Sequence, residues 1–416
     1  MSLKFRLILM NFLQFFVWGS WLLTIGAYWF QTKHWSGTEF GAIFSTMGIA
    51  SLFMPAIAGI IADRWINAER LYGGFHIMGA IILFLVPTVN DPSRMFWIML
   101  INMIFYMPTI ALSITVAYSS MKSRNMDIIK EYPPVRVWGT IGFIVALWII
   151  SLSGFETTSA QFYVASAASL FLGIYAFTLP KCPPLGHGHK KSLVSALGLN
   201  AFALFKNVKM ALFFIFAMLL GASLQLTNAY GDTFLHDFAK IDIYKNLVAV
   251  THPAIIMSIS QISETLFILT IPFFLRRFGI KKVMIFSMVA WILRFGLFAY
   301  GNPGNGLWMI ILSCIIYGMA FDFFNISGSL FVETQSDPSI RASAQGLFMM
   351  MTNGIGAFLG SRISGIIIDK YFKTGDAFNW NGIWLTFATY SLAVAVLFAI
   401  FFKHKHDPKV LAQVNH

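Results

Sequence analysis

The sequence predicts an all-α integral membrane protein with twelve transmembrane helices in two six-helix halves. Hydrophobic residues make up 57% of the 416 residues and charged residues only 11%, whereas soluble proteins carry about 25% charged residues. The mean hydropathy is +0.72. The apolar residues are gathered in segments of about 20 residues, the length at which a helix crosses a hydrocarbon core of roughly 30 Å. These observations exclude a soluble globular fold.

Twelve hydrophobic segments can be placed along the chain, with ends set to within about three residues. The segments cover residues 5–30, 40–62, 71–88, 95–118, 135–154, 160–179, 209–231, 253–275, 282–300, 307–331, 342–368 and 380–402. The first segment has a basic start, but its apolar run is too long for a signal-peptide core. We therefore expect it to be retained as a span.

The longest interval on the expected cytoplasmic side separates six segments from six, the layout of a transporter built from two repeated halves. Prolines and glycines in PKCPPLGHGHKKS indicate a linker, and residues 193–205 predict a short amphipathic helix on the membrane surface. The predicted parts are an N-terminal six-helix bundle at 1–179, a cytoplasmic linker at 180–208, a C-terminal six-helix bundle at 209–402 and a cytoplasmic tail at 403–416.

The distribution of positive charge predicts the orientation of the chain. Its formal net charge is +12, but the basic residues form no block or motif typical of nucleic-acid binding, so no nucleic-acid partner is expected. Most of the 29 Lys and Arg residues fall in loops on one side of the predicted topology, which the positive-inside rule makes cytoplasmic. An even number of spans then places both termini in the cytoplasm.

The loop between the second and third segments carries a recognisable motif, GIIADRWINAER. It resembles the G-x-x-x-D-R-x-G-R-R loop of the major facilitator superfamily, with Asn67 in place of the usual glycine. A related stretch, LRRFGIKK, stands at the corresponding place in the second half but lacks the aspartate. The resemblance implies the major facilitator fold and a conformational role for Gly59, Asp63, Arg64 and Arg70.

Polar side chains stand within four of the predicted spans. A carboxylate near the centre of a membrane helix costs about 2.5–3.5 kcal/mol on insertion scales, so such a helix normally faces a cavity or a partner. Helical spacing places Arg136, Thr140 and Phe143 on one stripe, and likewise pairs Gln225 with Asn228 and Gln261 with Glu264. The residues are Arg136, Thr140 and Phe143; Gln225 and Asn228; Gln261 and Glu264; and Tyr317, Phe321, Asp322 and Asn325.

Several of these side chains also have a purely structural interpretation. Arg136 opens its predicted span, so its guanidinium could extend to the cytoplasmic headgroups. The amides could join neighbouring helices, and Glu264 could pair with Arg294 on the next span. Phe321 could face lipid, because the chain is 16% aromatic. At the cytoplasmic end of the tenth span, Glu333 and Arg341 are expected to form a gate or a salt bridge.

The four polar stripes predict the kind of solute that the protein handles. In a two-half transporter such helices meet around a central cavity near the bilayer midplane. Amides, two carboxylates and aromatic rings suit an uncharged solute with hydroxyl groups and a planar ring. Neither a phosphate-binding glycine loop nor a metal-ligand pattern is present, and Cys182 and Cys314 imply no disulfide, so we expect no cofactor and no ATP drive. A titrating carboxyl is then the simplest means of coupling to protons.

A closer resemblance covers nearly the whole chain. It is carried by FLQFFVWGSWL, PPVRVWGTIGF, FFIFAMLLGASLQLTN, IIMSISQISETLFILTIPFFL, KKVMIFSMVAWILRFGLFAYG, YGMAFDFFNISGSLFVE and IRASAQGLFMMMTNG. These stretches resemble the bacterial nucleoside permeases, the nucleoside–proton symporter family. The resemblance implies proton-driven uptake of purine and pyrimidine nucleosides, such as uridine and adenosine, across a bacterial inner membrane. The binding positions that it implies are Arg136, Thr140, Phe143, Gln225, Asn228, Gln261, Glu264, Tyr317, Phe321 and Asp322.

These positions lead to a hypothesis for the mechanism. Glu264 and Asp322 bind the ribose hydroxyls or the base edge, the amides complete the hydrogen bonds, and Phe143 and Phe321 stack on the base. One carboxyl carries the coupled proton, with Asp322 slightly favoured over Glu264. Arg136 adjusts the proton affinity of that carboxyl and forms part of the inner gate. The transporter is expected to work as a monomer.

Nucleoside symport has three alternatives, one within the class of transporters and two from other classes. A major facilitator symporter for sugars or another small polar solute would use the same architecture. A polytopic membrane enzyme could use Glu264 and Asp322 as acid and base, although the sequence shows no nucleophile or metal constellation and has near-equal halves. A nucleoside-sensing receptor would bind its ligand without accumulating it.

Overall fold

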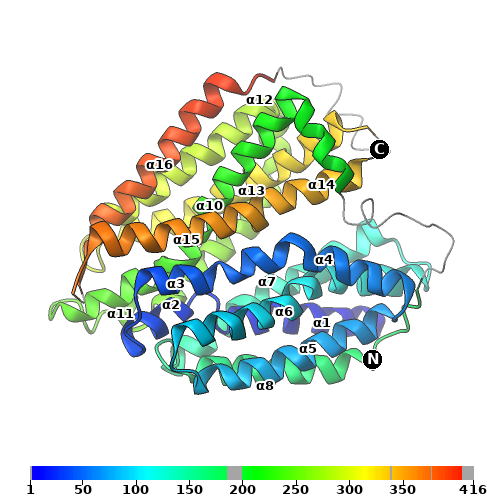
Figure 1. Ribbon diagram of the computed structural model, residues 1–416, viewed down its shortest axis with the longest axis horizontal. Helices are drawn as coiled ribbons and strands as arrows, with labels where there is room; N and C mark the ends of the chain where they lie inside the picture. The colour runs from blue at the N-terminus through cyan, green and yellow to red at the C-terminus, as the bar shows by residue number, and fades with distance from the viewer. Residues whose placement is uncertain (1, 185–198, 338–339, 376, 405–416) are drawn as a thin grey trace. The chain divides into compact units, whose positions relative to one another are not determined.

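Helices make up almost all of the chain in the computed structural model, which describes residues 2–184, 199–337, 340–375 and 377–404 (Figure 1). The chain divides into two compact units, Met1–Leu197 and Gly198–His416. The all-α class that hydropathy predicts is confirmed. Part of the predicted linker and most of the predicted tail lie outside the described residues, and the predicted domain boundaries stay predictions.

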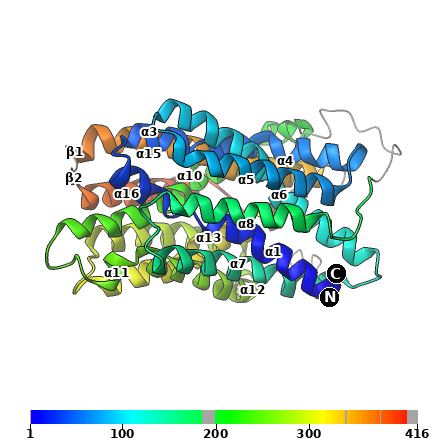
Figure 2. The same ribbon diagram turned by 90° about the horizontal axis from the view of Figure 1, so that it is seen from below.

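The N-terminal unit consists of helices joined by short loops. α1 packs against α7 (Figure 2), α5 against α8, and α4 against α6. The elements in chain order are α1 (Leu3–Gly19), α2 (Ile25–Ala27), the π-helix η1 (Tyr28–Thr32), α3 (Gly37–Phe44), α4 (Thr46–Arg64), α5 (Ala68–Leu85), the 3₁₀ helix η2 (Val86–Thr88), α6 (Pro92–Lys122), α7 (Ile128–Leu152) and α8 (Ala160–Ala176).

Side chains in the sequence fix where these helices begin. Ser36 and Glu39 form a reciprocal capping box at the start of α3. Asp91 caps α6 by accepting a hydrogen bond from the Arg94 amide, and Pro92 occupies the first helical position, where its missing N–H costs nothing. These caps satisfy backbone donors that a helix cannot satisfy itself.

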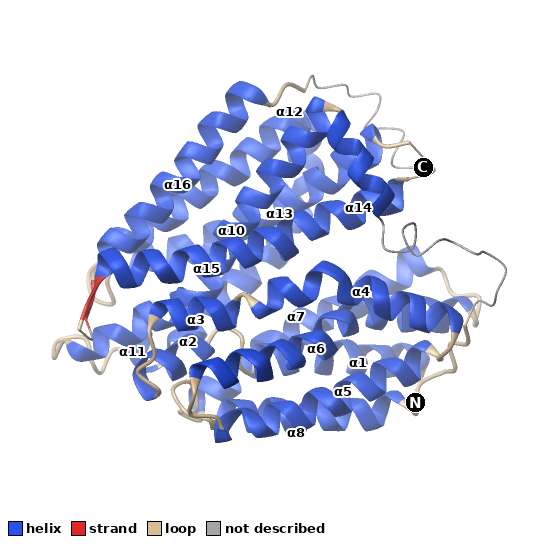
Figure 3. Ribbon diagram, in the orientation of Figure 1, coloured by secondary structure: helices blue, strands red, loops and turns tan. Residues whose placement is uncertain are grey.

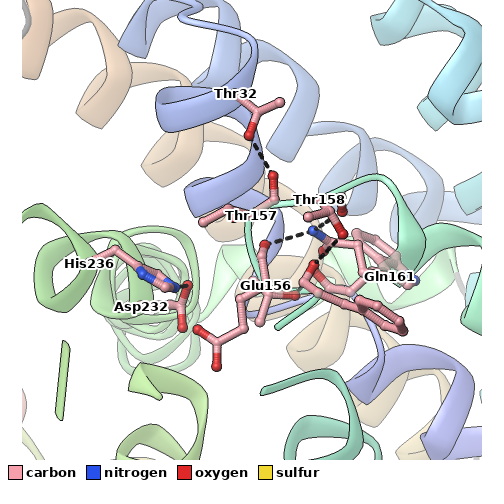
Figure 4. Close-up of polar contacts among 10 residues, drawn as sticks. Thr32, Glu156, Thr157, Thr158, Gln161, Asp232 and His236 are labelled. Atoms are coloured by element: carbon pink, nitrogen blue, oxygen red, sulfur yellow. Dashed lines mark hydrogen bonds and ion pairs between the residues drawn. The ribbon is translucent and has the colours of Figure 1, made fainter. Parts of the chain in front are cut away.

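The first predicted span is interrupted in the structure. α1 ends at Gly19, and a turn covers residues 20–24 before α2 begins. Polar side chains of this turn form hydrogen bonds. The Ser20 hydroxyl donates to the Phe16 carbonyl and the Thr24 hydroxyl donates to the Gln161 side chain, each at 2.8 Å. Gln161 in turn donates to the carbonyls of Glu156 and Thr158 (Figure 4). The hydropathy profile does not reveal this break in the helix, because the residues around it are apolar or small.

The C-terminal unit is also helical apart from one antiparallel strand pair, drawn red in Figure 3, in which Lys373 pairs with Phe378. α12 packs against α13 and α16, and α10 packs against α15 and η5. The elements are the 3₁₀ helix η3 (Leu199–Lys206), α10 (Val208–Asp237), the 3₁₀ helix η4 (Phe238–Lys240), α11 (Val248–Thr251), α12 (Pro253–Tyr300), α13 (Leu307–Gln335), α14 (Arg341–Met349), the π-helix η5 (Met350–Gly356), α15 (Ala357–Ile367), the π-helix η6 (Ile368–Phe372), β1 (Lys373–Thr374), β2 (Ala377–Phe378) and α16 (Trp380–Phe401).

Two of these elements bear on the predicted linker and the predicted eighth and ninth spans. The predicted amphipathic helix begins outside the described residues, and its last part belongs to the 3₁₀ helix η3. α12 has 48 residues and breaks at Gly279, whose φ of 77° is left-handed, a conformation that favours glycine. Phe274 and Phe286, on either side of the break, bring their ring centroids to 6.1 Å. The chain therefore turns back at a single residue.

Eight helices among the described residues are long and apolar enough to cross a membrane. One of them is α12, which contains both the predicted eighth and ninth spans. The multi-pass membrane character is thus confirmed, while the number of twelve crossings stays a prediction. The expected salt bridge between Arg341 and Glu333 is present at 3.2 Å.

Candidate functional site

Seven of the ten predicted binding residues lie on three helices of the C-terminal unit. α10 carries two, α12 carries two and α13 carries three, and α12 packs against both of the other helices. Gln225, Asp322 and Tyr317 are buried, while the others are half-buried. The seven residues are Gln225, Asn228, Gln261, Glu264, Tyr317, Phe321 and Asp322.

A close backbone contact holds α12 against α13 at the centre of this set. The Ser263 hydroxyl donates to the Ile315 carbonyl. A Cβ atom on Gly318 would lie 2.6 Å from the Ser263 carbonyl oxygen, so only glycine fits there. The contact positions Glu264 beside α13, where its carboxyl interacts electrostatically with Tyr317 and Asp322. The structure thus brings the two predicted carboxyl groups together.

Aromatic rings line the same region of α13. Tyr317 and Phe321 are stacked almost in parallel, with an interplanar angle of 4° and centroids 5.9 Å apart. Trp291 of α12 meets Tyr317 edge-on at 6.0 Å. Phe321 lines a small cleft together with Trp291, Asn325 and Asn353. Aromatic and amide side chains therefore lie side by side here, and both kinds of group suit contact with a planar polar ligand.

Three buried acceptor oxygens of this site have no hydrogen-bond partner among the residues that the structure describes. They are Gln225 Oε1, Gln261 Oε1 and Asp322 Oδ2. An unsatisfied buried acceptor costs about 1–3 kcal/mol, so native structures rarely leave one without a reason. One of these oxygens belongs to each of the three site helices. The set is therefore an array of acceptors suited to the hydroxyl and N–H donors of a ligand.

The other three predicted residues, Arg136, Thr140 and Phe143, lie on α7 of the N-terminal unit. Arg136 stands two turns inside the helix rather than at its opening, because α7 begins at Ile128. Its guanidinium lies 4.1 Å from the ring centroid of Phe15 on α1. The guanidinium therefore makes a cation–π contact within the bundle, and its position relative to the headgroups stays a prediction.

Two glycines on α7 make that contact possible. A Cβ on Gly139 would lie 2.7 Å from both the Arg136 guanidinium and the Phe15 ring. A Cβ on Gly142 would lie 2.1 Å from the Phe12 carbonyl oxygen. α1 and α7 therefore approach backbone to backbone beside Phe143, which is 8% exposed.

The predicted conformational loop lies between α4 and α5. Gly59, Asp63 and Arg64 belong to α4 and Arg70 to the first turn of α5. Asp63 and Arg70 are exposed, and a Cβ on Gly59 would meet no heavy atom within 4 Å. The conformational role of these four residues stays a prediction.

Sequence reasoning missed the buried carboxylate of this loop, Glu69, which is 2% exposed. Its two oxygens accept hydrogen bonds from the Cys182 amide at 2.8 Å and from the Asn67 side chain at 3.1 Å. The Ala68 amide donates to the Cys182 carbonyl. Glu69 thus ties the loop to the segment after α8, and only its spatial neighbours reveal that role.

A second missed carboxylate, Asp232, continues the polar stripe of α10. It follows Asn228 by one helical turn, is 1% exposed, and lies 3.7 Å from His236 one turn further on (Figure 4). The predicted seventh span ends at residue 231, whereas α10 continues to Asp237. The spacing from Asn228 was the signal that could have included it.

Comparison with known proteins shows the family to which the chain belongs. The sequence profile of the family described as "Nucleoside H+ symporter" matches residues 1–407. The xanthosine permease of Escherichia coli K12 is 54% identical over 410 residues, covering 98% of both chains. The nucleoside permease NupG of the same organism is 53% identical over 407 residues, covering 98% of this chain and 97% of NupG.

Solved structures show the same relationship. A crystal structure of the nucleoside transporter NupG superposes with a TM-score of 0.91 and 52% identity, covering 97% of this chain and all of that chain. A mutant of NupG superposes with a TM-score of 0.94 over the same shares. The chain has the major facilitator fold of a membrane transporter and belongs to the nucleoside H+ symporter family.

Proposed function

We propose that this protein takes up nucleosides together with protons by alternating access. Family membership supports a permease, and the enzyme alternative is set aside because the relatives are permeases. The observation that carries the proposal is that each of the three site helices has one buried acceptor without a partner, while α13 also carries the stacked rings of Tyr317 and Phe321. The three acceptors are Gln225 Oε1, Gln261 Oε1 and Asp322 Oδ2. A nucleoside supplies a planar base and several hydroxyl donors in one molecule.

Each group of the site has a role in this proposal. The ribose hydroxyls and the base N–H groups donate to the unsatisfied oxygens, and Asn228 and the amide N–H groups complete the hydrogen bonds. Phe321 and Phe143 are proposed to stack on the base, and Thr140 is proposed as a further binding residue. Satisfying acceptors that are otherwise buried without partners makes binding selective for solutes with matching donors.

The carboxyl groups of Asp322 and Glu264 are proposed to couple transport to protons, with Asp322 as the carrier. Asp322 is 5% exposed, so its ionised form opposes closure of the site, and protonation removes that cost. One proton crossing 100 mV supplies about 2.3 kcal/mol, enough for roughly a 45-fold accumulation of a neutral solute. Arg136 on α7 is proposed to adjust the proton affinity of that carboxyl and to form part of the inner gate.

The finer properties follow from the same proposal. The transporter works as a monomer in a bacterial inner membrane, with both termini in the cytoplasm, and needs no cofactor because the proton gradient drives it. Uridine and adenosine are the first substrates to test. Xanthosine belongs in the same test, because the xanthosine permease is as similar to this chain as NupG is.

Uptake of the three labelled nucleosides into proteoliposomes, with and without an inward proton gradient, tests the proposal. We expect accumulation that depends on the gradient and that a protonophore abolishes. Equilibration without accumulation would contradict proton coupling. Inhibition by free ribose but not by unlabelled nucleosides would favour the sugar symporter, and binding without entry would favour the receptor.

The stack between Arg136 and Phe15 makes a separate prediction. Replacing Phe15 by Leu removes the ring face under the guanidinium, a contact worth about 0.5–2 kcal/mol, so uptake is expected to fall by about two- to thirtyfold. Initial rates of uridine uptake would measure the loss. Phe15→Tyr, which keeps a ring, should retain most activity.

Phe12→Leu is the matched control for that change, because Phe12 lies on the same helix and its ring stacks on Phe16 instead. Equal losses in Phe15→Leu and Phe12→Leu would show that the guanidinium contact contributes nothing beyond packing of α1.

A further inference from the structure

Arg294 is a fully buried arginine in the second limb of α12, with 0% of its surface exposed. Sequence reasoning offered it as an ion partner for Glu264. Its hydrogen bonds in the structure go instead to neutral groups: Nη1 donates to the Ser313 carbonyl at 2.6 Å, and Nε donates to the Thr227 hydroxyl at 3.3 Å. Both terminal nitrogens reach the Ser260 hydroxyl at 3.5 Å.

These partners lie on the three helices that form the C-terminal part of the nucleoside site. Thr227 on α10 directly precedes Asn228, and Ser260 on α12 directly precedes Gln261. Ser313 lies one helical turn before Tyr317 on α13, and its hydroxyl donates back to the Arg294 carbonyl at 2.9 Å. One guanidinium therefore fixes α10, α12 and α13 at positions next to binding residues.

The flat face of the guanidinium makes the remaining contact. Its central carbon lies 4.6 Å from the ring centroid of Tyr317 and 5.0 Å from that of Phe298. Because Tyr317 itself stacks on Phe321, a continuous stack runs from the arginine to the ring proposed to hold the base. Cation–π contacts of this kind are stronger when water is excluded.

We propose that Arg294 is a positioning residue of the nucleoside site, acting through Tyr317 and through its hydrogen bonds to the flanking residues of the site helices. The inference rests on the proposed nucleoside function. A buried guanidinium is costly in a membrane protein, and an apolar side chain would fill the same volume at lower cost. The guanidinium of Arg294 supplies two things that this position needs: several N–H donors in one plane, and a positively charged face for stacking. A lysine side chain has neither.

A double-mutant cycle on the purified full-length protein tests this inference. The dissociation constant of uridine would be measured by isothermal titration calorimetry for the wild type, Arg294→Lys, Tyr317→Leu and the double variant. Each single change is expected to weaken binding by about tenfold. Because both changes break the same stack, the combined loss of binding in the double variant should be clearly smaller than the 100-fold product of two independent tenfold losses. The hydrogen bonds of Arg294 to Thr227 and Ser260 do not involve Tyr317, so the double variant should still bind somewhat more weakly than either single variant.

Independent effects that multiply to about 100-fold, or an unchanged dissociation constant in Arg294→Lys, would overturn the inference. A residue needed only for folding would lower the thermal midpoint without this coupling in the dissociation constant. If wild-type protein binds no uridine, adenosine or xanthosine, the proposed function fails and the inference with it. Wild-type binding that Arg294→Lys leaves unchanged defeats the inference alone.

A second variant keeps the test decisive should Arg294→Lys fail to fold. Replacing Thr227 by Val and Ser260 by Ala leaves the arginine in place but removes two of its acceptors on α10 and α12. We expect several-fold weaker uridine binding from this pair, and unchanged binding would count against Arg294 as a positioning residue.

Discussion

Replacing Asp322 by Asn is expected to abolish proton-driven accumulation of nucleoside while nucleoside exchange across the membrane continues. Asn has nearly the same shape but binds no proton, so it imitates the protonated carboxyl permanently. At 100 mV the accumulation ratio should fall from as much as about 45 to about 1. Paired measurements of gradient-driven uptake and of counterflow in proteoliposomes would separate the two activities.

Two companion variants give this experiment its controls. Glu264→Gln distinguishes the roles of the two interacting carboxyl groups. If one of the two variants still accumulates nucleoside, the carboxyl group that it lacks is a binding group and not the proton carrier. Asp242→Asn changes an aspartate that is 95% exposed and paired with Lys245, so uptake should be unaffected. If Asp322→Asn and Glu264→Gln both keep gradient-driven accumulation, the proton is carried elsewhere.

Gly318→Ala is expected to destabilise the protein and to weaken nucleoside binding together. The new methyl group would lie 2.6 Å from the Ser263 carbonyl oxygen, and backbone cannot move aside as a flexible side chain can. Overpacking of this kind costs about 1–3 kcal/mol. The neighbours of the contact, Tyr317 and Glu264, are site residues, so a shift of α13 against α12 also displaces them. Thermal unfolding in detergent and the dissociation constant of uridine measure the two effects.

Gly296→Ala is the matched control on α12. A Cβ at this position meets no heavy atom within 4 Å, and alanine favours a helix by about 1 kcal/mol over glycine. This variant should therefore unfold at the same temperature as the wild type or higher. Equal midpoints for Gly318→Ala and Gly296→Ala would show that the α12–α13 contact is not tight.

The fold was predictable because hydropathy reports on burial in lipid, and that signal is repeated in every long helix. Interruptions were not predictable in the same way. The turn at residues 20–24 depends on Gln161, which is far away in sequence. The continuation of α10 to Asp237 is a second example, because it includes the buried carboxylate of Asp232. Hydropathy averaged over a window falls at each charged residue, so the predicted span stopped at residue 231.

The candidate site likewise has features that the sequence predicts and features that only the packing of helices reveals. Helical spacing places Gln261 with Glu264 and Gln225 with Asn228, since that depends only on the geometry of one helix. The partners of Arg294 depend on how three helices pack, and they are neutral groups that no charge-pairing argument selects. Likewise the loop motif draws attention to Asp63, whereas the carboxylate that makes buried contacts is Glu69.

The break at Gly279 has a consequence for how the chain is made. Its two limbs are joined by one left-handed residue and by the rings of Phe274 and Phe286 packed across it. No extended segment separates the two limbs, so they have little freedom to move apart from each other. We therefore expect the two limbs to enter the membrane together as one hairpin, and we expect a tag or protease site inserted at this point to disturb membrane integration.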